Sequence, residues 1–573
     1  MRDAEHPGRA GGSTRAGVSA RGDWWRSAVV YQVYPRSFAD ADGDGIGDIP
    51  GLISRLDYLA SLSLDAIWIS PFYTSPLHDG GYDVSDYRSI DPRLGTLDDV
   101  SALIEQAHAR GMHVLMDIVP NHTSSEHAWF QELLAAGPES PAAERYIVRP
   151  GKVGGTKPPN NWRSVFHGAG WSPLPAPDGA DSGFWYLHLF DSTQPDLNWQ
   201  HPEVVAEFES ILRFWFDLGV DGFRIDVAHG MVKAEGLPDV AEPSNEDEAL
   251  LSEHRTPYWD QDGVHEIYRG WRAIADSYPD PRVFCGEAWV ESEERLARYL
   301  RPDELHTSFN FEYLKAGWSA ERMRAVIDQT IATHATIGAP PTWVLSNHDV
   351  IRHRTRMAPL DTAGRADLDR GLHRARAATL FALALPGSAY LYQGEELGLP
   401  EVVDLPDEAR QDPAWLRSGG TDGVRDGCRV PIPWSGTEPS YGFGPGSSSW
   451  LPQPMEWADL SVRAQDSVEG STLEFYRRAL AARRSEASMG DGPLAWLPEL
   501  ADEPSALGIR RTAPDGSSVL AIINLGEANL RLAPSLGIEV LVESGEMVAV
   551  VSEDPASEPR LVVGPETAVW LRG

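Results

Sequence analysis

Short apolar runs rich in β-branched residues alternate with amphipathic segments along most of this 573-residue chain. Between such runs, the segments 97–110, 204–218 and 374–385 carry apolar residues at helical spacing. The runs themselves predict eight buried strands, at 29–38, 64–73, 113–120, 220–227, 282–289, 308–313, 342–347 and 389–393. Eight strands in βα alternation predict an α/β fold of the (β/α)8 TIM-barrel type.

Three further stretches do not fit the alternation. Residues 121–198, rich in Pro, Gly, Asn and Trp, predict a small domain inserted after the third strand, over the active-site face. A long Pro- and Gly-rich loop, 400–470, follows the eighth strand, and a helix over 472–484 closes the barrel. From about residue 488 the pattern changes to short strands, which predict a C-terminal β-sandwich; we place these strands at 506–512, 518–524, 538–542 and 567–571.

The predicted domain organisation has four parts. A Gly-, Arg- and Ala-rich segment without the apolar core of a signal peptide predicts a disordered N-terminal tail. In chain order the parts are the tail (1–22), the catalytic barrel (23–120 and 199–487), the inserted domain (121–198) and the C-terminal β-sandwich (488–573).

The net charge and the number of cysteines limit which partners and which cellular compartment are expected. The formal net charge of −36 argues against nucleic-acid or anionic-membrane partners, and no apolar run is long enough to span a membrane. Two cysteines cannot form a disulfide framework. Cys285 lies in a predicted strand, where a buried free thiol fits a reducing, cytoplasmic compartment.

Three acids, Asp226, Glu287 and Asp349, each follow a predicted strand. The carboxyl ends of parallel barrel strands form the active-site face, so the three side chains are expected to converge there. Converging carboxylates are typical of glycosidic bond cleavage through an oxocarbenium-like transition state.

The residues next to these acids indicate different roles. Arg224 lies two positions before Asp226 and projects to the same side, so we expect it to lower the pKa of Asp226, as a nucleophile requires. A structural salt bridge is the alternative. Glu287 follows an apolar strand and precedes Trp289, and a raised pKa there would suit a general acid/base; an isolated buried Glu is the alternative. Asp349 could bind sugar hydroxyls and stabilise the oxocarbenium ion.

Four motifs in order make the chain resemble glycoside hydrolase family 13, the α-amylase superfamily. They are 117–122 (DIVPNH), 222–226 (GFRID), 286–287 (GE) and 347–349 (NHD). The resemblance runs from about Trp24 to the C-terminus, and within the family it is to the α-glucosidase and oligo-1,6-glucosidase branch. It implies that Asp226 is the nucleophile, Glu287 the acid/base and Asp349 the transition-state stabiliser.

The same resemblance implies a sugar pocket. Tyr82 and Asp83 match the pair that stacks under and anchors glucose at subsite −1, and an Asp gripping the non-reducing-end hydroxyls would make the enzyme exo-acting. Arg352 matches an arginine that contacts Asp83 or the sugar.

Other implied sugar contacts come from two histidines and one aromatic residue. His122 and His348 match hydroxyl-binding histidines, although either could be a core histidine on sequence alone. Phe166 resembles an aromatic residue that lines the pocket from the inserted domain.

A loop with acids at alternate positions predicts a metal site. Carboxylate and carbonyl oxygens at this spacing suit Ca²⁺, and a solvated acidic turn is the alternative. The resembled branch binds Ca²⁺ or Mg²⁺ at this loop, away from catalysis, and no zinc spacing or organic cofactor is expected. The predicted ligands are Asp40, Asp42, Asp44, the carbonyl of Ile46, and Asp48.

The linkage that is cleaved has conflicting signals. In the resembled branch Val at position 227 often accompanies α-1,6 preference, whereas the continuation 228–233 (AHGMVK) resembles α-1,4-specific α-glucosidases. We favour α-1,4, because one pocket side chain shifts preference by only ~1–3 kcal/mol. Rival hypotheses are an oligo-1,6-glucosidase, a transglycosylase of the sucrose isomerase or trehalose synthase type, and a non-catalytic relative. The expected partner is a small oligosaccharide, and the expected state a monomer or small homo-oligomer.

Overall fold

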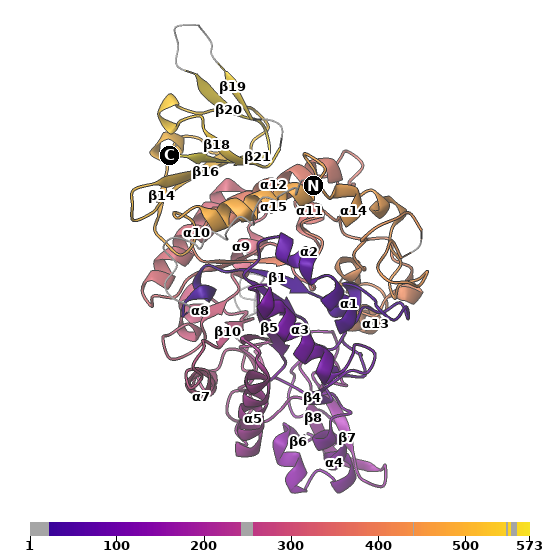
Figure 1. Ribbon diagram of the computed structural model, residues 1–573. Coiled ribbons are helices and arrows are strands. Elements are labelled where there is room, and N and C mark those ends of the chain that lie inside the picture. Colours follow the sequence, from indigo (N-terminus) through magenta and orange to yellow (C-terminus); the bar gives the residue numbers. More distant parts are fainter. Residues whose placement is uncertain (1–21, 242–255, 424, 439, 546–547, 552–558) are drawn as a thin grey trace, which may run out of the picture.

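The centre of the molecule is a parallel barrel (Figure 1). The computed structural model describes residues 22–241, 256–423, 425–438, 440–545, 548–551 and 559–573. The predicted tail therefore lies almost wholly outside the described residues. The barrel sheet has the strand order β11-β10-β9-β5-β2-β1-β13-β12, as predicted for a TIM barrel. Its strands are β1 (Val29–Val33), β2 (Ala66–Ile69), β5 (His113–Ile118), β9 (Gly222–Ile225), β10 (Val283–Gly286), β11 (Thr307–Ser308), β12 (Thr342–Val344) and β13 (Ser388–Tyr392).

One backbone hydrogen bond joins the two edges of this sheet. The N–H of Asn310, just after β11, donates to the carbonyl of Thr342 at 3.1 Å. The ring of strands is thereby nearly closed, and the carboxyl ends of all eight strands share one face.

Helices cover the outside of the barrel, and their ends follow local sequence. Thr96 and Asp99 form a capping box at the start of α3, and Gly219 adopts a left-handed conformation (φ 111°) at the end of α5. The helices are α1 (Ile49–Ser54), α2 (Leu56–Ser61), α3 (Leu97–Ala109), α4 (Ala128–Ala136), α5 (Pro202–Leu218), α7 (Val264–Ala275), α8 (Glu293–Tyr299), α9 (Phe311–Lys315), α10 (Ala320–Ala335), α11 (His353–Arg356), α12 (Leu368–Ala384), α13 (Pro413–Ser418), α14 (Val462–Gln465) and α15 (Thr472–Ser485).

All eight barrel strands end earlier than predicted, and two of them end five residues early. The run 29–38 leaves the strand after Val33 because Pro35 begins a 3-10 turn. The run 308–313 is a strand only to Ser308, because the side chain of Asn310 accepts the Tyr313 N–H at 2.8 Å and caps α9. Apolar content alone does not distinguish a buried strand from a buried helical turn.

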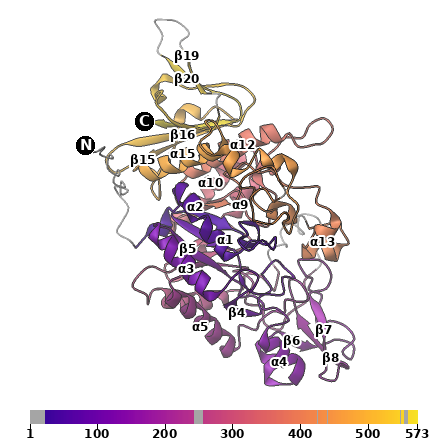
Figure 2. The ribbon, with the colours of Figure 1, turned by 45° about the vertical axis from the view of Figure 1, so that its right-hand side comes forward.

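The segment between β5 and α5 carries its own small antiparallel sheet. Its strands are β6 (Val148–Pro150), β7 (Trp171–Pro175) and β8 (Asp181–Leu187), in the order β6-β8-β7, and they lie beside α4 at one end of the molecule (Figures 1 and 2). Trp162 and Trp171 of this segment pack in one apolar cluster with Val227 and Trp259, which follow β9. This shared core holds the segment against the loop that carries the nucleophile candidate. A two-stranded hairpin, β3 (Tyr73–Thr74) and β4 (Asp86–Ile90), follows β2.

The C-terminal region forms two facing sheets with a common core. Leu520 and Ile522 from one sheet pack with Leu561 and Val563 from the other. The indole N–H of Trp570 donates to the Leu380 carbonyl at 3.0 Å and ties the region to α12. The strands are β14 (Leu494–Trp496), β15 (Ala506–Thr512), β16 (Ser518–Asn524), β17 (Leu530–Arg531), β18 (Val540–Glu543), β19 (Val548–Val551), β20 (Arg560–Val563) and β21 (Thr567–Arg572), in the orders β14-β15-β16-β21-β18 and β17-β20-β19.

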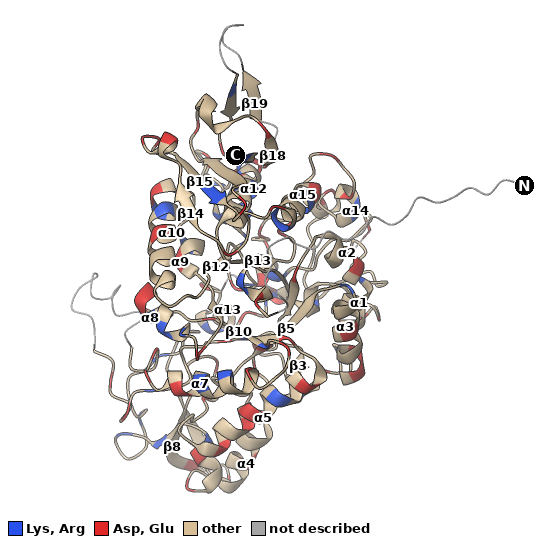
Figure 3. Ribbon diagram, turned by 60° about the vertical axis from the view of Figure 1, so that its left-hand side comes forward, with Lys and Arg blue, Asp and Glu red and all other residues tan. Residues whose placement is uncertain are grey.

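Charged residues are spread over the helices of both ends of the molecule (Figure 3). Over the part of the chain that the structure describes, every helix is too short or too polar to cross a membrane. Cys285 and Cys428 are both buried and unpaired, as expected for Cys285.

Candidate active site

A buried arginine gathers three carboxylates at the end of β9. Arg224 is 1% exposed and donates through Nη1 to Asp117 at 2.8 Å and to Asp226 at 2.7 Å. Its Nη2 donates to Oε2 of Glu287 at 2.5 Å. Two predicted catalytic acids therefore share one guanidinium, and Asp117, the first residue of the DIVPNH motif, joins them.

Asp349 completes the group from the loop after β12. Its Oδ1 accepts from Arg429 at 2.8 Å and from Arg425 at 3.3 Å, and its Oδ2 lies 3.0 Å from Nε2 of His348. The side chains of Asp226, Glu287 and Asp349 are 10%, 12% and 28% exposed. All three are thus partly open to a ligand at the carboxyl end of the barrel, which is where catalytic residues of this fold lie.

The pKa of Asp226 differs from the expectation. Burial and the neighbouring carboxylates of Glu287 and Asp117 outweigh Arg224 and raise the pKa of Asp226 well above its usual range. Burial also raises the pKa of Asp117 to about 6. One guanidinium cannot neutralise three carboxylates, so the cluster takes up protons as a unit.

Asp349 shows the opposite behaviour. Burial alone would raise its pKa, but His348, Arg429 and Arg425 together lower it below the usual range. Burial lowers the pKa of His348 itself to about 3, so at neutral pH the arginines keep Asp349 ionised.

Four predicted sugar contacts lie around these acids. The Tyr82 hydroxyl donates to Oδ2 of Asp117 at 3.0 Å, and its ring stacks on His348 at 5.2 Å between centroids. Nε2 of His122 lies 3.2 Å from the Tyr82 carbonyl, and burial lowers the pKa of His122 to about 4. Phe166 reaches the group from the inserted segment, with the Arg425 guanidinium 4.9 Å from its ring centre.

Two predicted sugar-binding residues, Asp83 and Arg352, have other partners than the catalytic acids. The Asp83 carboxylate accepts from the Ser75 hydroxyl and from the N–H groups of His78 and Asp79, so it stabilises its own turn. Arg352 donates to the main-chain carbonyls of Gln393 (2.8 Å) and Cys428 (2.7 Å). Arg352 therefore does not meet Asp83, and its expected contact with the sugar stays a prediction.

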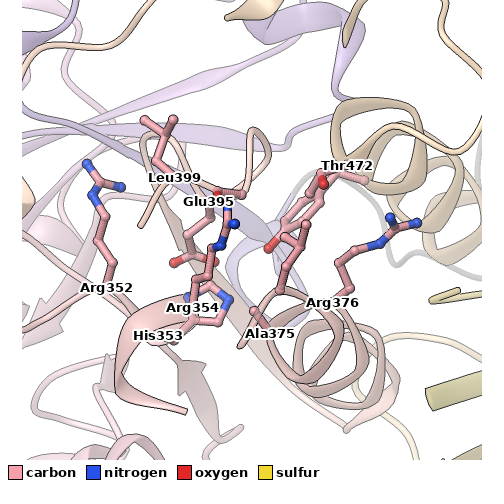
Figure 4. A pocket seen from close by; sticks show the side chains of 11 residues that line it. Arg352, His353, Arg354, Ala375, Arg376, Glu395, Leu399 and Thr472 are labelled. Carbon is pink, nitrogen blue, oxygen red and sulfur yellow. Dashed lines mark hydrogen bonds between the residues drawn. The ribbon is translucent and has the colours of Figure 1, made fainter. Parts of the chain in front are cut away.

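Arg352 instead faces another part of the barrel. With His353, Glu395 and the first turns of α15 it lines a cavity of about 10 Å³, large enough for one water molecule (Figure 4). This surrounding is typical of a residue that supports the loop after β12 from behind.

Asp79 and Arg425 form the charge pair that the sequence analysis missed. Arg425 Nη2 donates to Asp79 at 3.0 Å and to Asp412 at 2.8 Å. Burial raises the pKa of Asp79 to about 6 although Arg425 opposes it. The available signal was weak: Asp79 lies three residues before Tyr82, and Arg425 lies in the 400–470 loop, which has no periodic pattern.

The acidic loop brings three of its four predicted carboxylates together. Oxygens of Asp40, Asp42 and Asp48 lie within 4.8 Å of one another. Asp44 is not in that group, and its Oδ1 accepts the N–H of Ile46 at 2.7 Å. The Asp40 N–H donates to the Phe443 carbonyl at 2.8 Å, which ties this loop to the long loop that carries Arg425. Carboxylates so placed could hold a hard cation.

Known proteins are similar to this chain in sequence and fold over most of its length. A family model described as the α-amylase catalytic domain matches residues 32–492. A probable alpha-glucosidase of Rhizobium meliloti (strain 1021) is 35% identical over 552 residues, 93% of this chain and 95% of the relative. An oligo-1,6-glucosidase of Parageobacillus thermoglucosidasius is 34% identical over 538 residues, 88% and 91% of the two chains.

A solved structure agrees with these relatives. The crystal structure of the alpha-glucosyl transfer enzyme XgtA matches with a TM-score of 0.82 at 35% identity, over 96% of this chain and 99% of that one. The chain belongs to the α-amylase family, glycoside hydrolase family 13, and is a glycoside hydrolase with α-glucosidase-type activity.

Proposed function

We propose that this glycoside hydrolase is a retaining, exo-acting α-glucosidase that releases α-glucose from the non-reducing end of maltose-type α-1,4 oligosaccharides. The observation that carries the proposal is the sharing of Arg224 by Asp226 and Glu287. Both carboxylates bind the Nη atoms of one guanidinium, so they lie close together. Retaining glycosidases need carboxyl groups only about 5–5.5 Å apart, whereas inverting enzymes need room for a water between them.

The first step uses one proton of the carboxylate cluster. Asp226 attacks the anomeric carbon in its ionised form. The Nη1 hydrogen bond of Arg224 favours this form, although burial and the neighbouring carboxylates raise the pKa of Asp226. Glu287 gives its proton to the glycosidic oxygen as the bond to the leaving sugar breaks. The products are a β-linked glucosyl ester on Asp226 and the leaving sugar, whose former glycosidic oxygen is now a hydroxyl group.

The second step restores the configuration. Glu287, now a carboxylate, takes a proton from a water that attacks the anomeric carbon, and the ester bond to Asp226 breaks. Two inversions give α-glucose. Asp349, kept ionised by Arg429 and Arg425, stabilises the positive charge of both transition states.

An exo mode follows from the pair Asp79 and Arg425. Their charged groups stand beside Asp349 and Phe166, and such groups suit the hydroxyls at the far end of a terminal glucose. In this proposal they replace Asp83 and Arg352 as the anchors of subsite −1.

Val227 supports a second candidate, an oligo-1,6-glucosidase. It follows the nucleophile directly, has φ of 45°, and packs with Trp259 in the core shared with the inserted segment. Because Val227 is only 6% exposed and packs in that core, we keep the α-1,4 assignment first. Transfer of glucose to a second sugar is the third candidate, since the same glucosyl ester can react with a hydroxyl instead of water.

The deciding experiment compares kcat/KM for glucose release from maltose and isomaltose, with Asp226→Asn as the blank. Maltose well ahead supports the α-1,4 proposal, and isomaltose well ahead replaces it with the second candidate. Turnover retained by Asp226→Asn would remove Asp226 from its role. Disaccharide and glucose yields at high maltose measure the transfer reaction, and a purely hydrolytic profile would dismiss it.

We further propose that the acidic loop holds a structural Ca²⁺ or Mg²⁺ through Asp40, Asp42 and Asp48, with Asp44 and the Ile46 carbonyl as the remaining predicted ligands. The grouped oxygens of the first three support this. The ion would neutralise the loop and take no part in bond cleavage. The two buried free cysteines support a reducing, cytoplasmic location.

A further inference from the structure

The carboxyl group of Glu287 is held by three donors from two segments, the end of β9 and the loop after β10. Its Oε2 accepts from Arg224 Nη2 at 2.5 Å and from the N–H of Val227 at 3.2 Å. Its Oε1 accepts from the indole Nε1 of Trp289 at 3.2 Å. The two oxygens therefore have different surroundings: among the hydrogen bonds of the described residues, only that of Trp289 reaches Oε1.

This asymmetry places the transferable proton. Arg224 and the Val227 N–H can only donate, so a proton on Oε2 would meet two other hydrogens. The proton of neutral Glu287 must be on Oε1. The indole N–H is also a donor only, so it occupies one lone-pair direction of Oε1 and leaves the other for the proton.

The ring of Trp289 is itself fixed by helix α9. Trp289 stacks face to face on Phe311, with centroids 3.7 Å apart and planes 6° apart. Lys315 Nζ lies 4.9 Å from the Trp289 ring centre. Phe311 and Lys315 are four residues apart on α9, so they lie on the same face of that helix. The N-cap Asn310 anchors α9 to the barrel.

We propose that Trp289 is a positioning residue that fixes Oε1 of Glu287 toward the leaving oxygen and stabilises the carboxylate once its proton has gone. This inference rests on the proposed acid/base role of Glu287. It makes α9, a helix outside the catalytic motifs, part of the support of the acid.

The test is Trp289→Phe, which keeps an aromatic ring able to stack on Phe311 and removes the indole N–H together with the five-membered ring that carries it. Maltose needs a proton on its leaving oxygen, whereas α-glucosyl fluoride releases fluoride with little acid assistance. We expect kcat/KM for maltose to fall about tenfold, part of the 10²–10⁴-fold that general acid catalysis supplies. For fluoride release, which reports the first step alone, we expect less than about a twofold change. The basic limb of the maltose profile should move to higher pH, because a donor to the carboxylate is lost.

Three variants separate the outcomes. Trp318→Phe removes an indole N–H bonded to the Leu525 carbonyl far from the acids, and should leave both substrates unchanged. Phe311→Leu removes the stacking partner and should repeat the Trp289→Phe pattern more weakly, even if Trp289→Phe folds poorly. Glu287→Gln tests the underlying role: it must lose maltose turnover while keeping fluoride release.

Each failure has its own meaning. Equal loss on both substrates by Glu287→Gln would overturn the proposed function. With that control as expected, equal loss on both substrates by Trp289→Phe would overturn the positioning role. So would a rise in KM for maltose with kcat and the basic limb unchanged, because Trp289 would then only be a surface that stacks on the leaving sugar.

Discussion

Replacing Arg224 by Met removes the one cation that faces three buried carboxylates while keeping a side chain of similar length. Arg224 makes bonds of 2.8, 2.7 and 2.5 Å to Asp117, Asp226 and Glu287, whose side chains are 0%, 10% and 12% exposed. Breaking a buried pair by removing one partner typically costs about 3–5 kcal/mol, because the remaining charge is left buried without a partner. The protein can avoid part of this cost by binding one more proton in the cluster.

The size of the loss therefore depends on pH. An extra proton on a carboxyl with an unfolded pKa near 3.9 costs ~1.4 kcal/mol for each pH unit above that value. The cost is ~1.5 kcal/mol at pH 5 and ~5.5 kcal/mol at pH 8. The sign follows because the folded variant binds more protons than the unfolded chain. Its folded pKa is raised, so the contribution is fully present below pH ~4 and stability is lost as pH rises.

The assay is urea denaturation of wild type and Arg224→Met at pH 5, 6.5 and 8, with catalytic-barrel fluorescence as the signal. We expect the stability difference between the two proteins to grow from ~1.5 kcal/mol at pH 5 to ~3–5 kcal/mol at pH 8, where leaving the charge unpaired costs less than binding the extra proton. Arg354→Met is the matched control: Arg354 is buried and donates to the carbonyls of Leu368 (3.1 Å) and Gly398 (2.5 Å). Its loss should be nearly independent of pH. A pH-independent loss for Arg224→Met would show that packing, not charge, is at stake, and would refute the reasoning.

Four other expected results follow from the site. Arg425→Ala should raise KM for maltose at least about tenfold, because the Asp79 carboxylate loses its partner, whereas a change within twofold would argue against an anchoring role. Asp79, with a pKa of about 6, should be ionised above pH 6, so KM should rise as pH falls through 6 and this dependence should vanish in Asp79→Asn. Asp349→Asn should lower kcat/KM by about 10²-fold or more, measured with maltose. A chelator should lower Tm, and excess Ca²⁺ should restore it. At a Ca²⁺ concentration of 100 times Kd, the bound ion should add up to ~2.7 kcal/mol to the free energy of unfolding. Asp40→Asn should abolish this response, and the surface variant Asp98→Asn should not.

The fold could be predicted where a local stretch of sequence shows which residues are buried. The barrel strands and their helices are continuous apolar or amphipathic segments, so their order could be predicted before any geometry was known. The errors lie where one residue decides: Pro35 ends the first strand, and Asn310 turns an apolar run into helix α9. In the C-terminal region β14, β17, β19 and β20 were missed, because strands of two to four residues are too short for alternation to be visible.

The same limit applies to the active site: residues at strand ends could be predicted, and residues placed by distant partners could not. Asp226, Glu287 and Asp349 follow strands, and a strand end has a fixed direction, so the sequence alone predicts their convergence. Asp79 and Asp83 stand in one irregular turn, where neither periodicity nor strand direction says which carboxylate faces the sugar. The choice depends on donors: the hydroxyl and amide groups of Ser75 and His78 satisfy Asp83, and Arg425, more than three hundred residues away, meets Asp79. Long-range partners of this kind are invisible in a local pattern. Specificity in this enzyme is therefore to be sought in the 400–470 loop that supplies Arg425 rather than in the motifs that supply the chemistry.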